Sequence, residues 1–265
     1  MNSPRTPTLL LALAMASALN AASVLRPGDI VTEITNLVDR ATGQVVSPEQ
    51  LQGKVLFLDF FAHWCPVCRA AAPQIQQGIG DRYSQQDGNA EGLPVLHIGV
   101  NLQADNNDAN RNATTTFAQI YRIPLVVQDS SRRFQGLFGP TSGQPTFAII
   151  NGVTNSPSHR LWELIYARFS YQDSTATRPI EAFQTAIDSV QAPPPQLEAF
   201  RIRPDGHWEF SITGPGRAPV LLEWSEDLGG WQSTGMNFPT AEPAPYHLPA
   251  PTTTPGGYLR LRRLR

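Results

Sequence analysis

The sequence predicts an α/β fold, a central mixed sheet flanked by helices, followed by a small antiparallel β domain. Up to about residue 190, short apolar runs rich in β-branched and aromatic residues alternate with segments of helical pattern. Three prolines, Pro193–Pro195, interrupt this alternation, and beyond them only short strand-like runs separated by glycine and proline remain. We therefore expect an α/β domain at 23–191, a linker at 192–196 and a β module at 197–265.

The N-terminus has the layout of a secretory signal peptide. Arg5 precedes the apolar segment Leu9–Leu19, and small residues follow at 16–18 and 21–23. The apolar segment is well short of the ~20 residues that a membrane-spanning helix needs. An ordinary N-terminal helix is the alternative interpretation. We expect a signal peptide at 1–22 and an exported protein, either periplasmic or extracellular.

Composition narrows the possible functions. The formal net charge is −2 and charged residues make up 16% of the chain, which argues against nucleic acid as a partner. The chain has 2 cysteines, Cys65 and Cys68, so both thiols belong to one pair and no separate structural disulfide can form.

The elements up to the cysteines follow from local pattern. Residues 39–44 predict a hairpin turn with Gly43 at positive φ. The apolar run Val55–Phe61 is too short for a helix and predicts a buried strand. Three alanines at 70–72 favour a helix, which places Cys65 at its N-terminus. Unpaired backbone N–H groups and the helix dipole there favour a thiolate, the nucleophilic form of cysteine.

The remaining elements of the α/β domain alternate in the same way. We expect strands at 93–100, 125–129, 147–150 and 161–169, helices at 113–121, 132–138 and 180–190, and a polar surface loop at 101–112. This alternation implies a partly parallel sheet covered on both faces.

The stretch around the cysteine pair carries a family resemblance. Residues 59–69, DFFAHWCPVCR, followed by Pro73, resemble the thioredoxin-like thiol-disulfide oxidoreductases, in particular the exported branch that includes the cytochrome-maturation reductases. The resemblance implies a thioredoxin fold and a redox-active disulfide, Cys65–Cys68, with no other cofactor. It also implies protein disulfide or thiol substrates and a membrane or exported electron donor. One departure is Ala71, where the cytochrome-maturation reductases usually carry glutamate.

The chemistry of the pair can be written in steps. Cys65, expected to be the more exposed thiol, attacks a target disulfide, and the deeper Cys68 resolves the mixed disulfide. Asp59 lies six residues before Cys65, at the position of the buried acid in thioredoxins, and is expected to act as the base for Cys68. The alternative for Asp59 is a solvated acid at the end of a strand.

Residues beside the motif have two interpretations each. Trp64 either packs beside the pair, where it contacts substrate, or belongs to the core. His63 either stabilises the thiolate or is simply exposed. Pro66 and Val67, between the cysteines, are expected to tune the redox potential.

A second part of the site is expected near residue 145. Gly143, Gln144 and Pro145 precede the strand at 147–150. A proline is tolerated at the opening of a strand but not inside a central one. In the resembling family this proline is cis and faces the cysteines, leaving the backbone of the preceding residue, here Gln144, free to pair with a bound peptide.

The β module has a weaker signal. Strand-like runs at 200–202, 207–212, 220–224 and 258–264 predict a small antiparallel β module. Within it, residues 222–228, Trp231 and residues 258–261 loosely resemble C-terminal β modules of large secreted bacterial proteins, a resemblance that names no ligand.

We interpret the chain as an exported thiol-disulfide oxidoreductase, a reductase or isomerase rather than a strong oxidant. Three alternatives stay open. The cysteines could form an inert structural disulfide. They could bind metal, although a tetrahedral zinc site needs four ligands and the sequence has no second cysteine pair. Copper binding together with His97 or His159 is the other metal alternative. The third is a secreted binding protein whose β module is functional and whose redox pair is vestigial.

Overall fold

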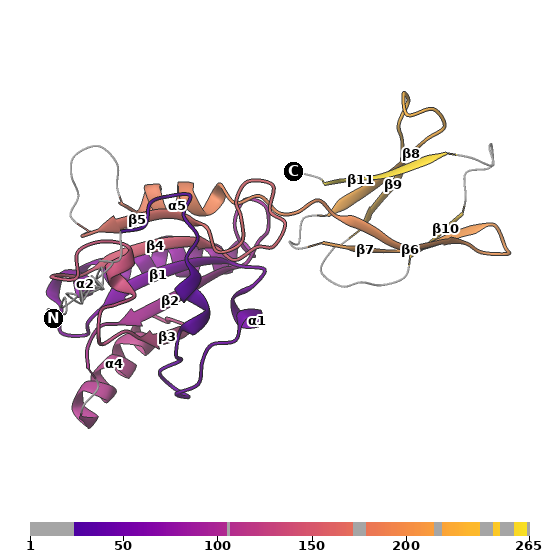
Figure 1. The fold of residues 1–265 in the computed structure, drawn as a ribbon. Coiled ribbons are helices and arrows are strands. Elements are labelled where there is room, and N and C mark those ends of the chain that lie inside the picture. The colour runs from indigo at the N-terminus through magenta and orange to yellow at the C-terminus, as the bar shows by residue number, and fades with distance from the viewer. Residues whose placement is uncertain are drawn as a thin grey trace, which may run out of the picture.

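The computed structural model describes residues 24–104, 107–171, 179–214, 219–238, 246–249 and 257–263. Its strands form a five-stranded sheet flanked by helices and, beyond it, two three-stranded antiparallel sheets (Figure 1). This arrangement confirms the predicted fold class. The predicted signal peptide at 1–22 lies outside the described residues. Among the described helices, none is both long enough and apolar enough to cross a membrane.

The large sheet has the strand order β3-β2-β1-β4-β5. Neighbouring pairs among β1, β2 and β3 are parallel, whereas β4 pairs antiparallel with β1 and with β5. The strands are β1 (Val55–Phe61), β2 (Val95–Asn101), β3 (Leu125–Gln128), β4 (Thr146–Asn151) and β5 (Leu164–Phe169).

Strand β1 is the centre of this sheet, and all seven of its residues are buried. Asp59 in β1 lies opposite Gly99 of β2 and opposite Phe147 of β4. Since side chains alternate along a strand, Phe57, Asp59 and Phe61 point to one face of the sheet. The position of Asp59 is therefore set by the pleat of a fully buried strand.

Short helical segments connect the strands. They are η1 (Thr32–Asn36), α1 (Pro48–Leu51), α2 (Pro66–Ile75), the π-helical turn η2 (Gln76–Asp81), α3 (Arg82–Gln85), α4 (Asp108–Ile120), η3 (Gln135–Leu137) and α5 (Pro179–Asp188). The predicted turn at 39–44 is present, with Gly43 at φ 70°.

The longer helices pack on one face of the sheet only. Side chains of α2 and α5 pack with Phe57, and side chains of α2 and α4 pack with Phe61. The other face, which carries Leu58 and Phe60, is covered by residues of the segment 31–51 and of the turn at 134–138. Because β1, β2 and β3 follow one another in one direction, right-handed crossovers place α2 and α4 on the same face. The predicted coverage of both faces holds, but not by helices alone.

Two predicted helix boundaries are wrong. Helix α4 begins at Asp108, earlier than the predicted 113, because the Asn107 side chain caps it by accepting a hydrogen bond from the Asn110 backbone N–H at 2.9 Å. The predicted helix at 132–138 is reduced to the short 3₁₀ turn η3.

The C-terminal sheets form a separate small core. Their orders are β10-β7-β6 and β11-β8-β9, and Phe210, Ile212, Val220 and Leu222 are buried among them. Strands β9 and β10 were not predicted, and β6 begins at Gln196, inside the predicted linker. The strands are β6 (Gln196–Ile202), β7 (His207–Thr213), β8 (Val220–Ser225), β9 (Gln232–Phe238), β10 (Tyr246–Pro249) and β11 (Tyr258–Arg263).

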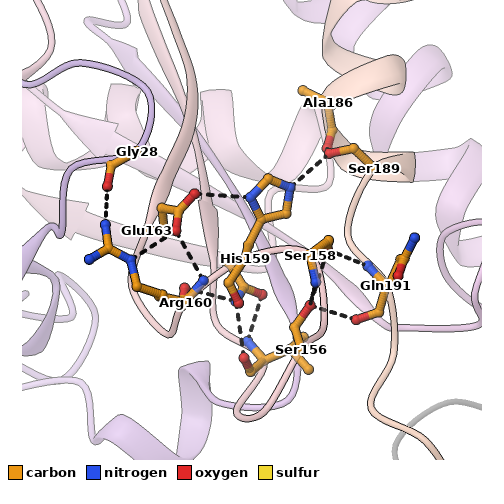
Figure 2. A network of polar contacts seen from close by, with 11 residues as sticks. Gly28, Ser156, Ser158, His159, Arg160, Glu163, Ala186, Ser189 and Gln191 are labelled. Carbon is orange, nitrogen blue, oxygen red and sulfur yellow. Dashed lines mark hydrogen bonds and ion pairs between the residues drawn. The ribbon is translucent and has the colours of Figure 1, made fainter.

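A polar network holds the chain at the point where it leaves α5 (Figure 2). His159 contacts Glu163 through Nδ1 at 3.1 Å and the Ser189 hydroxyl through Nε2 at 3.2 Å. The backbone of Gln191 is bonded on both sides, its N–H to the Ser158 hydroxyl and its carbonyl to the Ser156 hydroxyl. The loop between β4 and β5 thus fixes the residue that precedes the proline-rich segment.

Candidate functional site

The cysteine pair lies where β1 leads into α2. Cys65 is the N-cap residue of α2, with Pro66 in its first turn, and its backbone N–H donates to the Ala62 carbonyl at 2.9 Å. Cys65 and Cys68 form a disulfide with their Cα atoms 5.3 Å apart. The position at the helix N-terminus, which the alanines at 70–72 predicted, is confirmed.

The exposure of the two thiols differs from the expectation. We expected Cys65 to be the more exposed, but Cys65 is 4% and Cys68 3% exposed. The residues around both sulfurs, including Phe61 and Ala72, form one apolar cluster. Exposure therefore does not distinguish the attacking thiol from the resolving one.

Hydrogen bonding does distinguish them. The backbone N–H of Cys68 donates to Cys65 Sγ at 3.2 Å. This N–H belongs to the first turn of α2, where backbone donors lack helical partners and the dipole is positive. A negative charge is therefore favoured on Cys65, which fits the role of attacking thiolate predicted for it.

The predicted cis proline faces the pair. The peptide bond Gln144–Pro145 is cis, and the carbonyl oxygen of Gln144 lies 4.0 Å from Cys65 Sγ. Pro145 itself is buried, and its carbonyl accepts from the Ser170 backbone N–H at 2.9 Å, which ties it to the end of β5. The placement beside the cysteines agrees with the prediction, whereas a role in binding substrate stays a prediction.

Two side chains that the sequence did not indicate hold this proline loop. Gln135 is fully buried, and its Nε2 donates to the Gly143 carbonyl at 2.6 Å and to the Thr146 hydroxyl at 3.0 Å. Arg132 donates to the Gln144 side-chain oxygen at 3.0 Å. No local pattern marks these residues, because their partners lie about ten residues further along the chain.

Asp59 is buried inside β1. It is 4% exposed and points to the face that α2 covers, so a solvated acid at a strand end is excluded. Two residues before its β2 partner Gly99 lies His97, whose Nε2 is 3.9 Å from Asp59 Oδ2. From the sequence, His97 is a candidate only as a distant copper ligand; its contact with Asp59 has no local sequence signal, because the two residues meet through strand pairing.

The residues beside the motif are arranged at the surface. Trp64 is 52% exposed and donates from Nε1 to Gln103 Oε1 at 2.6 Å, so it is not a core tryptophan. His63 is half-buried, and its Nδ1 lies 3.3 Å from the Thr114 hydroxyl, so it is not simply exposed. Pro66 and Val67 are exposed between the cysteines, and their predicted effect on the redox potential stays a prediction.

The metal alternative finds no support around the pair. Within the described ranges, no three side chains among His, Cys, Asp and Glu gather as metal ligands do. Of the two histidines considered, His159 is engaged with Glu163 and Ser189, and His97 lies beside Asp59.

The comparisons with known proteins give partial likenesses. No protein-family model matches the chain. A probable nucleoredoxin 3 from rice, Oryza sativa subsp. japonica, is 32% identical over 100 residues, which cover 38% of this chain and 19% of the rice protein. The chain therefore spans about a fifth of the curated relative that it matches.

Two solved structures are also similar. A secreted Mycobacterium tuberculosis disulfide oxidoreductase, described as homologous to E. coli DsbE, is 18% identical, covering 58% of this chain and 96% of its own with a TM-score of 0.39. A putative thiol:disulfide interchange protein DsbE from Chlorobium tepidum is 23% identical, with 62% and 96% coverage and a TM-score of 0.40. The sheet order, the cysteine that caps α2 and the cis proline agree with the thioredoxin fold that the sequence predicts.

Proposed function

We propose that this chain, with its thioredoxin-like fold, exchanges disulfides with protein substrates through Cys65 and Cys68. One observation carries the proposal: the disulfide lies at the N-terminus of α2, and its first sulfur lies 4.0 Å from the backbone carbonyl before a cis proline. An inert structural disulfide needs neither the helix N-terminus nor the neighbouring backbone, and a loop this short restricts the unfolded chain little.

The exchange proceeds in two steps. In the reduced protein, the Cys65 thiolate attacks one sulfur of a substrate disulfide, and the other substrate sulfur leaves with the electron pair. The Cys68 N–H stabilises the attacking charge, and the carbonyl of Gln144, beside Cys65 Sγ, accepts a hydrogen bond from the substrate backbone. Cys68 then loses its proton to Asp59 and attacks Cys65, which restores the Cys65–Cys68 disulfide and releases the reduced substrate.

The preferred direction is reduction or isomerisation rather than strong oxidation. A strong oxidant owes its potential to a strongly stabilised reduced form. Here the donor to Cys65 Sγ is the backbone N–H of Cys68, which carries no charge. A neutral donor stabilises a thiolate less than a cationic side chain does, and this supports a lower reduction potential. We expect equilibrium titration against glutathione to give a potential well below the roughly −120 mV of a strong oxidant. A potential near that value would reverse the proposed direction.

Reduction of insulin by dithiothreitol, followed by turbidity, tests the activity itself. The wild-type chain should accelerate precipitation of the insulin B chain, and Cys65→Ser should abolish the acceleration. The matched control is Gln85→Ala, an exposed residue of α3. Failure of the wild type to act with dithiothreitol, glutathione or a reduced thioredoxin as donor would refute the proposal.

Export to the periplasm or the extracellular space is part of the proposal, with a membrane or exported protein as electron donor. Its support is the signal-peptide pattern at 1–22 and the oxidising compartments in which such exchange is needed. Mass spectrometry of the N-terminus of the mature protein, combined with cell fractionation, is the test. An uncleaved chain recovered from the cytoplasm would contradict export.

A second candidate function is binding through the C-terminal sheets. It is favoured by β6, an edge strand that exposes Phe200 and Ile202, with Trp208 of β7 beside Phe200 at 5.8 Å between ring centroids. To separate the candidates, a deletion strain is complemented with Cys65→Ser or with Phe200→Ser and Ile202→Ser together. Loss of complementation by the second variant alone would favour binding.

A further inference from the structure

A cavity of about 440 Å³ lies between the π-helical turn η2, α3 and the start of β2. It extends from the buried His97 to residues at the surface, among them Ser84 and Asp87. Its other polar lining comes from Gln76, Asp81, Tyr83 and Arg122. The volume is many times the ~30 Å³ that one water molecule occupies in the liquid, so the cavity can hold a connected group of waters.

The sequence of the active-site helix explains this opening. Pro73 lies inside α2, where it removes a helical hydrogen bond, and the helix widens into the π-helical turn within one turn of it. Gly78 and Gly80 in that turn add no side chains. Insertions of this kind are frequent at functional sites.

His97 is a buried polar residue of the cavity lining. It is 4% exposed, and neither ring nitrogen has a hydrogen-bond partner among the described residues. Buried polar groups are nearly always bonded, so such a histidine requires an explanation. Its Nε2 lies 3.9 Å from Asp59 Oδ2, about 1 Å longer than a hydrogen bond, and a small movement of either side chain closes this gap.

We propose that His97 relays protons between Asp59 and the water of this cavity during the resolving step. The proposal rests on the exchange activity proposed above and adds one residue to it. Asp59 is 4% exposed, so a proton that exchanges between Asp59 and solvent needs a neighbouring group to carry it. Among the described residues, His97 both contacts Asp59 and lines the cavity, so it joins Asp59 to this space.

The relay balances as follows. The Cys68 thiol gives its proton to the Asp59 carboxylate, and the Cys68 thiolate forms the bond to Cys65 as the bond from Cys65 to the substrate sulfur breaks. The electron pair leaves with the substrate, which is reduced while the cysteine pair is oxidised. Asp59 passes the proton to His97 Nε2. Both ring nitrogens are buried, so a small movement of the ring then exposes Nδ1, which releases its proton to water in the cavity.

The other charged groups around the cavity do not replace His97. Asp81 is paired with Arg122 at 2.9 Å, and Asp87 lies at the surface. Burial, together with the nearby carboxylate of Asp188, raises the pKa of Tyr83, so its hydroxyl keeps its proton. His97 is the lining residue that contacts Asp59.

Reaction of the reduced protein with 5,5′-dithiobis(2-nitrobenzoate) in a stopped-flow instrument separates the two steps. Attack by Cys65 releases the first thionitrobenzoate, and attack by Cys68 on the mixed disulfide releases the second. In His97→Gln and in His97→Phe the first phase should match the wild type, whereas the second should slow by about tenfold. His159→Gln, which removes a histidine outside the site, is the control and should change neither phase.

Two further measurements separate proton relay from a structural effect. Added imidazole should restore the second phase of His97→Gln in proportion to its concentration. The double variant Asp59→Asn with His97→Gln should be no slower than Asp59→Asn alone, because both residues act on one route.

Some results would overturn the relay while leaving the exchange activity intact. They are an unchanged second phase in both His97 variants between pH 6 and pH 9, the absence of imidazole rescue, or additive losses in the double variant. A slowed first phase would also overturn it, since His97 would then act on Cys65. If the wild type released no thionitrobenzoate, both the relay and the exchange activity would be refuted.

Discussion

Gln135→Ala tests whether the buried side-chain amide of Gln135 stabilises the loop around Pro145. The variant removes two donors, leaving the Gly143 carbonyl and the Thr146 hydroxyl each without a buried hydrogen bond. Each loss costs about 1–3 kcal/mol. Part of this cost is offset because the Gln135 Oε1 atom, which has no partner among the described residues, is removed too. We therefore expect a loss of about 2–4 kcal/mol in the free energy of unfolding.

Urea unfolding of the oxidised chain measures this loss. Gln119→Ala on the exposed side of α4 is the matched control and should stay within about 0.5 kcal/mol of the wild type. Activity gives a second measurement. A looser loop should lower kcat/KM for insulin, whereas the first phase with the small aromatic disulfide should be unchanged because it needs only Cys65. A loss below about 1 kcal/mol with insulin reduction intact would refute the role assigned to Gln135.

Three further outcomes follow from the site and the core. Cys65→Ser should remove exchange activity, and Cys68→Ser should accumulate mixed disulfides visible on non-reducing gels. Equal alkylation rates of the two thiols in the reduced wild type would contradict the order in which Cys65 attacks and Cys68 resolves. Phe57→Ala should cost about 3–5 kcal/mol in urea unfolding, because the ring is fully buried, whereas Trp64→Ala should cost far less. Partial burial raises the pKa of Glu163, but hydrogen bonds from its neighbours outweigh burial and place the pKa below its ordinary 4.5. Its ionised form therefore stabilises the fold above pH 4.5, and the advantage of the wild type over Glu163→Gln in thermal unfolding should shrink as the pH falls below that value. A difference in thermal stability between the wild type and Glu163→Gln that stays constant with pH would contradict the lowered pKa of Glu163.

Local pattern was sufficient for the parts of the fold that depend on neighbours in sequence. The buried strand Val55–Phe61 and the helix that begins after Cys65 are both present as predicted. The cysteine pair and the cis peptide before Pro145 also lie where the motif and the resemblance placed them. These features are encoded in short stretches whose chemistry allows few alternatives.

Features set by distant contacts were not predicted. The role proposed for His97 depends on the pairing of β2 with β1, which brings its side chain next to Asp59. In the sequence, Gln135 is an ordinary polar residue, and its role depends on a hydrogen bond to Thr146, which lies further along the chain. Strand β9 was missed because its polar sequence around Gly235 and Asn237 lacks a clear alternation, so pairing with β8 decides its structure.

The fixed backbone at Gln191 also has a mechanical consequence. Ala192 and Pro193 are buried as well, so Pro194 and Pro195 alone separate the anchored chain from β6. Two prolines in extended form span about 6 Å, too short a tether for the C-terminal sheets to sweep a large volume. If the C-terminal sheets bind a protein, as in the second candidate function, that protein would approach Cys65 over a narrow range of orientations, because the link after α5 is short and stiff.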